Sequence, residues 1–132
     1  MLLIIYSILI SYMLFFTTCI APVVNTSLDQ NNSSRLLRKI FPKNFLFGLT
    51  FSVFALFLSI LQKNYIIFLL SVTLVVLFLF NLKYLMPKIN SVADLDKKNK
   101  KYSKKFKRLH LFSVILYLLK MLISILGIIL LY

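Results

Sequence analysis

The stretch that decides the fold is the last 24 residues of the chain, LHLFSVILYLLKMLISILGIILLY (residues 109–132). Six of its residues recur at spacings of 3, 4, 3, 4 and 3, which places them on one side of a helix: His110, Ser113, Tyr117, Lys120, Ser124 and Gly127. We call these six residues the polar seam. A helix of this length can cross a bilayer, so the seam must face protein or trapped water rather than lipid.

Three further apolar runs precede this one, at residues 2–24, 44–62 and 64–86. Each is close to the roughly 20 residues that a spanning helix needs. The chain is 132 residues long and 61% hydrophobic, which is more apolar surface than a soluble domain of this size can bury. The sequence therefore predicts an all-α membrane protein: residues 1–132 form a single bundle of four transmembrane helices, the last at about 109–131.

The net charge of +13 is distributed very unevenly along the chain. Fourteen Lys and Arg side chains lie between the first and second runs or from the end of the third run (Lys83) to the fourth, whereas the connection on the other side has only Lys63. By the positive-inside rule both basic loops are cytoplasmic and both termini lie outside. We expect a multi-pass protein of the bacterial inner (plasma) membrane. The polybasic segment Lys97–Arg108 is expected to bind anionic lipid headgroups rather than nucleic acid.

Helix boundaries and helix faces follow from the proline and small-residue patterns. Pro22 is expected to end the first helix, and Pro42 to separate a short interfacial helix at about residues 35–41 from the second spanning helix. Small residues that let helices approach closely recur along the second run: Gly48, Ser52, Ala55, Ser59 and Gln62. A weaker seam of this kind in the first run consists of Ser7, Ser11 and Thr18.

Lys120 is the most unusual residue of the polar seam. At ~1.5 Å per residue it lies ~16 Å from Leu109, near the middle of a ~30 Å hydrocarbon core. The chain contains no Glu, and its three Asp lie in the basic loops, so no carboxylate is available to pair with this lysine. Lys120 is therefore either buried in its neutral form or charged in a wet cavity beside Tyr117 and Ser124. An anion-binding or proton-handling site and a merely tolerated lysine are both open.

Catalytic and cofactor chemistry has little support in the sequence. The single histidine, His110, cannot supply bis-histidine haem ligation, and with the distant Cys19 it makes no zinc site. No paired carboxylates, Ser-His-Asp set or glycine-rich phosphate loop is present. We therefore expect a non-enzymatic protein without a metal or cofactor.

Four short motifs carry a family resemblance: Ala21-Pro22-Val23-Val24, Phe41-Pro42-Lys43-Asn44-Phe45, Met86-Pro87-Lys88-Ile89-Asn90 with Asp94, and Phe106-Lys107-Arg108-Leu109-His110 with Ser113. In this order and spacing the chain resembles the transmembrane-protein-205-like family of small four-helix membrane proteins. The resemblance implies a four-helix integral membrane domain whose molecular activity is not established. That family usually has an asparagine where this chain has Tyr117, and Lys120 lies outside its pattern.

The motifs and the topology together predict a polar cluster at the cytoplasmic face, built from these residues: Pro22, Phe41, Pro42, Pro87, Asn90, Asp94, His110 and Ser113. Such a cluster is either structural or a docking site for a small solute or partner protein. We expect small-solute handling or permeation, with a homo-oligomer or a membrane partner protein. An accessory or assembly subunit of a larger membrane complex is the alternative, and an enzyme or cofactor binder using His110 and Lys120 is the third.

Overall fold

The computed structural model describes residues 1–99 and 103–132, and every regular element in these residues is helical. Lys100, Lys101 and Tyr102 of the polybasic segment lie outside the described residues. In chain order the elements are α1 (Leu2–Phe15), the π-helical turn η1 (Phe16–Ile20), α2 (Ala21–Ser27), α3 (Gln30–Leu61), α4 (Tyr65–Phe80), the π-helical turn η2 (Asn81–Leu85), α5 (Met86–Lys98) and α6 (Lys104–Leu131).

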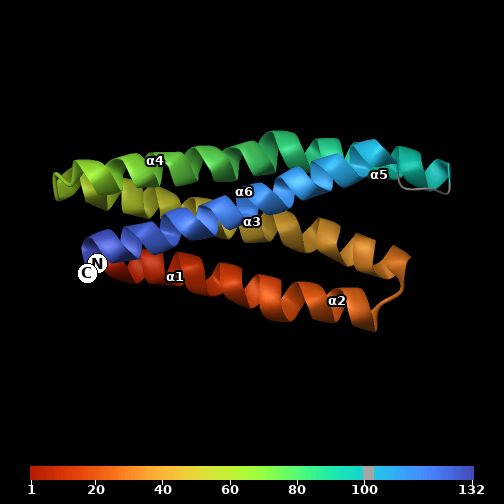
Figure 1. Cartoon of the computed structure of the whole chain (residues 1–132), viewed down its shortest axis with the longest axis horizontal. Helices are drawn as coiled ribbons and strands as arrows, with labels where there is room; N and C mark the ends of the chain where they lie inside the picture. Colours follow the sequence, from red (N-terminus) through yellow and green to blue (C-terminus); the bar gives the residue numbers. More distant parts are fainter. Residues whose placement is uncertain (100–102) are drawn as a thin grey trace.

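Within the described residues, four continuous helical spans are long and apolar enough to cross a membrane: Leu2–Ser27, Gln30–Leu61, Tyr65–Lys98 and Lys104–Leu131. They lie side by side, with both chain termini at one end of the bundle (Figure 1). The first span packs against the second and the fourth, and the third also packs against both. The predicted four-helix transmembrane bundle is therefore confirmed.

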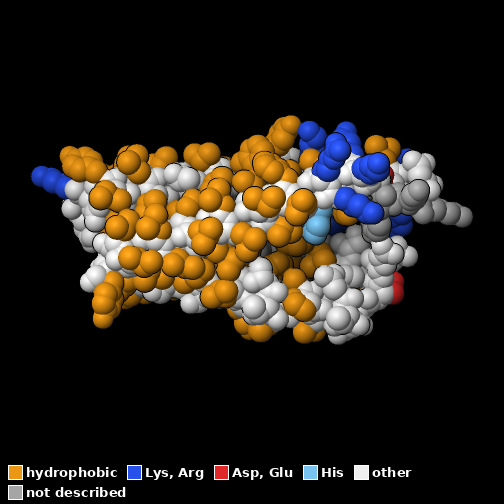
Figure 2. Space-filling view, in the orientation of Figure 1, with side chains coloured by type: hydrophobic (Ala, Val, Ile, Leu, Met, Phe, Trp, Pro, Cys, Tyr) orange, Lys and Arg blue, Asp and Glu red, His pale blue; other side chains and the backbone are white. Residues whose placement is uncertain are grey.

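The surface divides into two chemically distinct parts. Hydrophobic side chains cover most of the length of the bundle, and Lys and Arg gather toward the end opposite the termini (Figure 2). We call this end, which holds the α2–α3 and α5–α6 connections, the basic end. Each helical span runs antiparallel to the next one along the chain, so the two basic connections come to the same end of the bundle. The basic end therefore agrees with the charge asymmetry of the sequence.

The prolines do not divide the helices as predicted. Pro22 and Pro87 are each the second residue of an α-helix that directly follows a π-helical turn, and Pro42 lies inside α3. A proline ring clashes with the carbonyl of the preceding turn, and the wider π turn relieves that clash without ending the helix. The prediction that Pro22 ends the first helix is wrong, since α2 continues to Ser27.

The short interfacial helix predicted at residues 35–41 is not a separate element. These residues belong to α3, which begins at Gln30 because the Asp29 side chain caps it by accepting a hydrogen bond from the Asn32 N–H. The first, third and fourth spans likewise extend at the basic end beyond their apolar runs, to Ser27, to Lys98 and back to Lys104. Hydropathy marked the part of each helix that lipid surrounds and not the ends of the helix.

The inward faces agree with most of the predicted seams. On α6, the buried residues include Tyr117, Lys120, Ser124 and Gly127. On α3, the small residues at the bundle interior are Gly48, Ser52, Ala55 and Ser59, whereas Gln62 is exposed. The seam predicted on the first helix is wrong: Ser11 and Thr18 are exposed, and the buried residues of α1 are Leu2, Ile5, Tyr6, Leu9, Ile10 and Met13.

Candidate functional site

A pocket of about 590 Å³ opens at the basic end, between the start of α3 and the end of α5. α3 contributes three cationic side chains to its lining, and α5 contributes two carboxylates and one lysine. The charged residues are Arg35, Arg38, Lys39, Asp94, Asp96 and Lys97. We call this the basic-end pocket.

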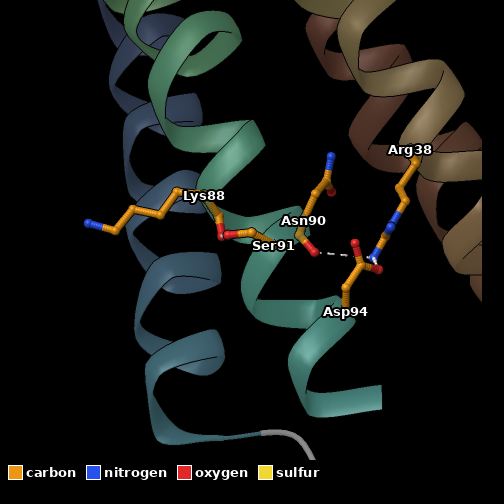
Figure 3. Close-up of polar contacts among 5 residues, drawn as sticks. All are labelled: Arg38, Lys88, Asn90, Ser91 and Asp94. Atoms are coloured by element: carbon orange, nitrogen blue, oxygen red, sulfur yellow. Dashed lines mark hydrogen bonds and ion pairs between the residues drawn. The ribbon is translucent and has the colours of Figure 1, made fainter. Parts of the chain in front are cut away.

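Arg38 and Asp94 form an ion pair across this pocket. Arg38 Nη2 lies 2.7 Å from Asp94 Oδ1 and also donates a hydrogen bond of 3.4 Å to the carbonyl oxygen of Asn90 (Figure 3). Both side chains remain partly exposed, at 34% and 59%. The hydrogen bond from Arg38 lowers the pKa of the Asp94 carboxyl, which lies beyond the apolar part of its span. The pair therefore ties α3 to α5 and keeps the guanidinium at the pocket wall.

The second carboxylate of the pocket holds the start of α6. Asp96 Oδ2 accepts hydrogen bonds from the Ser103 N–H at 2.8 Å and from Ser103 Oγ at 2.9 Å. Ser103 Oγ in turn accepts from the Phe106 N–H at 3.2 Å, which caps the helix. Both carboxylates are thus occupied by neighbouring groups.

Three cations of the pocket have no such partner. Among the residues that the structure describes, Arg35, Lys39 and Lys97 make no hydrogen bond or ion pair through their side chains. All three side chains line the concave surface of the pocket, and Lys97 interacts with Asp94 only through its charge, without direct contact. The pocket is therefore suited to an anionic group with several oxygen acceptors, such as a phosphate.

The predicted cytoplasmic-face cluster assembles only in part. Asn90 and Asp94 come together as expected, but through Arg38, which the sequence motifs did not single out. His110 is exposed and stacks on Phe106, with ring centroids 6.1 Å apart. Within the described chain, no hydrogen bond or ion pair joins the histidine to Asn90 or Asp94.

The other predicted members of the cluster lie elsewhere. Phe41 packs against Phe16, at 5.3 Å between ring centroids, in an aromatic layer inside the bundle. Pro22 and Pro87 are exposed, and Pro42 and Ser113 are half-buried. Phe41 therefore contributes to packing between η1 and α3 rather than to a polar site.

Lys120, in the middle of α6, lies in a cage of aromatic rings. Its side chain is fully buried, and its Nζ lies 4.5 Å from the ring centroid of Phe45, 4.3 Å from that of Phe78 and 5.1 Å from that of Tyr117. The neighbouring hydroxyls point elsewhere: Ser124 Oγ donates to the Lys120 carbonyl oxygen, and Tyr117 Oη accepts from Asn44 Nδ2. The surroundings of the amine are thus aromatic, in contrast to the wet cavity considered above.

The magnitudes show that this cage can hold a charged lysine. Placing a lysine at the centre of a spanning helix costs about 2.5–3.5 kcal/mol on the translocon-insertion scale. Each ring face within about 6 Å of an ammonium returns about 0.5–2 kcal/mol. Three rings around Lys120 therefore offset a cost of this size without any carboxylate.

Metal binding has no counterpart in this arrangement. Among the described residues, no three His, Cys, Asp or Glu side chains lie close enough together to hold a metal ion. Cys19 is free and exposed.

Comparison with known proteins places the chain in a family. Residues 4–98 match the model of a domain of unknown function, DUF4149. The chain belongs to that family. No curated protein and no solved structure matches it. The match to DUF4149 includes every charged residue that lines the basic-end pocket, and it ends before α6 and Lys120.

Proposed function

We propose that this DUF4149 protein is a multi-pass membrane protein that binds a phosphate-bearing small solute or lipid headgroup in the basic-end pocket. The observation that carries the proposal is the group of three unpaired cations, Arg35, Lys39 and Lys97, in one concave site. Arg38 is fixed beside them by Asp94, so the site is partly preorganised. The role is non-enzymatic binding or handling of the solute.

Proteins of this charge also attract anions without a defined site, so the test needs a matched control. Arg35→Gln and Lys39→Gln each remove one positive charge from the pocket. Lys107→Gln removes the same charge from the exposed start of α6, outside the pocket. We expect the two pocket variants to weaken phosphate binding at least ~5-fold, because each removes a charge from the site itself. Lys107→Gln should change phosphate binding by less than 2-fold, because salt screens the attraction of a distant surface charge.

The two sources of phosphate are separated by the choice of bilayer. The protein is placed in nanodiscs of phosphatidylcholine alone and titrated with inorganic phosphate by calorimetry at 0.15 M salt. It is then placed in nanodiscs containing phosphatidic acid, and retained lipid is measured by native mass spectrometry. Binding of phosphate indicates a soluble ligand, and selective retention of phosphatidic acid indicates a headgroup. Equal losses in all three variants would refute a defined site.

Orientation in the membrane is part of the proposal, with the basic end in the cytoplasm and the termini outside. A cysteine at Lys63, in a Cys19→Ser background, is expected to react with a membrane-impermeant maleimide in intact cells. A cysteine at Lys98 in the same background should react only after permeabilisation. The reverse pattern would contradict the orientation.

An accessory or assembly role is the second candidate. Between 28% and 33% of the most apolar 18-residue stretch of each span is buried inside the chain, so most residues of these stretches are not covered by the chain itself. Lipid or the helices of a larger complex can cover such a surface. Co-purification of a stable membrane partner from gently solubilised membranes, lost on mutation of outward-facing rather than pocket residues, would favour this role.

A further inference from the structure

Among the residues that the structure describes, three polar side chains inside the bundle have buried atoms without a hydrogen-bond partner: Lys120 Nζ on α6, the amide of Asn81 in η2 and the hydroxyl of Tyr12 on α1. Buried polar groups are almost always paired, because an unpaired one loses its hydrogen bonds to water and gains none inside the protein. Three such groups from three different helices form an unusual concentration in a bundle of this size.

Two of these groups lie close to one ring, that of Phe78, and the third lies one turn along the same helix. Lys120 Nζ lies 4.3 Å from its centroid. The Tyr12 hydroxyl and the edge of the same ring together fill the space over Gly48, where a Cβ would collide with both. Asn81 follows Phe78 by three residues, so the two share a face of their helix, and both are buried. Donors from α1 and α6 therefore lie at this ring, and the Asn81 amide lies on the same helix face one turn away.

The ammonium of Lys120 is stabilised by aromatic rings, but no anionic side chain lies beside it. The aromatic faces around Lys120 attract an ammonium, whereas a neutral amine gains little from them. The only carboxylates of the chain are Asp29, Asp94 and Asp96, all at the basic end and all bonded to neighbouring groups there.

We propose that Lys120, Asn81 and Tyr12 bind a small monovalent anion, of halide size, inside the bundle. The ammonium supplies the opposite charge, and the amide N–H and the phenol O–H supply neutral donors. Lys120 and Asn81 are fully buried, which favours a small ion over an organic anion. The Asn81 amide oxygen is an acceptor, so its partner is the ammonium or a water that accompanies the anion. This site is independent of the basic-end pocket.

The test uses the full chain in phosphatidylcholine nanodiscs, with chloride or bromide exchanged for gluconate at constant ionic strength. Binding is followed by the broadening of the ³⁵Cl resonance, and stability by the thermal unfolding midpoint, which rises when an ion binds the folded state. We expect Lys120→Met to weaken chloride binding at least ~10-fold and Tyr12→Phe to weaken it several-fold. The control Lys107→Met removes a surface charge. It should leave the chloride affinity, and the rise of the unfolding midpoint caused by chloride, within 2-fold of the wild-type values.

Two outcomes would overturn this site. In the first, the wild-type protein neither broadens the chloride resonance nor gains stability in chloride. In the second, Lys107→Met reduces the broadening as much as Lys120→Met does. If Lys120→Met does not fold, the wild-type response and Tyr12→Phe still decide the question. Loss of phosphate binding in Arg35→Gln with intact chloride binding would leave this proposal standing, so the two sites fail separately.

Discussion

Gly127 on α6 is the position at which the smallest change should have the largest effect on the fold. It faces α1, and a Cβ there would collide with three ring atoms of Tyr6. That ring cannot easily move aside, because it is fully buried and its hydroxyl shares a 2.9 Å hydrogen bond with Ser71 Oγ on α4. A single glycine therefore allows three of the four spans to meet at one point.

The expected cost of Gly127→Val follows from these contacts. Extra carbons in a packed core cost about 1–3 kcal/mol, and the upper part of that range applies where the neighbour is held on both sides. Valine has a better helix propensity than glycine, which offsets less than ~1 kcal/mol of this loss. We expect a net loss of about 2 kcal/mol, which lowers the ratio of folded to unfolded protein about 30-fold.

The measurement is denaturation of the purified protein by sodium dodecyl sulfate in mixed micelles, followed by far-ultraviolet circular dichroism. Leu126→Val, at the exposed neighbouring position, is the matched control and should cost little. The double variant Tyr6→Leu/Gly127→Val should lose at least 1 kcal/mol less than the sum of the single variants, because the smaller side chain relieves the collision. Strictly additive losses, or a stable Gly127→Val, would refute this contact between α1 and α6.

Three further predictions concern single polar contacts. Ser71→Ala removes the hydrogen bond to the tyrosine of α1 and should cost about 0.6 kcal/mol; Thr73→Ala, whose hydroxyl bonds only within its own helix, is the control in the same denaturation assay. Ser103→Ala removes the cap of α6 and should cost about 1 kcal/mol, seen as faster hydrogen exchange in its first turn. Asp94→Asn should slightly destabilise the protein at pH 7 but not at an acidic pH below the folded-state pKa of Asp94. Because Arg38 lowers the pKa of Asp94 in the folded state, the ion pair contributes above the unfolded-state pKa and is lost as pH falls through the folded-state value. An equal effect of Asp94→Asn at both pH values would contradict this account.

The inward face of α6 could be predicted because glycine and lysine are informative in a membrane. Neither residue gains from contact with lipid, so their common face had to point toward protein. Ser and Thr are poorer guides. Thr18 Oγ1 donates to the Leu14 carbonyl oxygen and Ser7 Oγ to that of Leu3, so these hydroxyls are satisfied within their own helix and need no interior position. This local bonding explains why the seam predicted on the first helix was wrong.

Pairings between helices could not be read from the sequence. Arg38 was one of many cations counted toward topology, and nothing in its local pattern indicated a partner 56 positions later. Tyr6 has the position of an interfacial aromatic near the end of its helix, yet its hydroxyl reaches Ser71 inside the bundle. Such contacts depend on the register between antiparallel helices, which hydropathy and small-residue spacing leave undetermined.

The proline motifs reveal how the two candidate sites are related in the structure. η1 and η2 are each followed by an X-Pro pair, Ala21-Pro22 and Met86-Pro87, so the first and third spans carry the same irregularity. η2 begins at the buried Asn81 and leads directly into α5, which lines the basic-end pocket. If ligand binding to the pocket shifts α5, the π turn is the point at which that movement would be absorbed or passed to Asn81. Chloride affinity measured with and without bound phosphate distinguishes these cases, because coupled sites must change each other's affinity by the same factor.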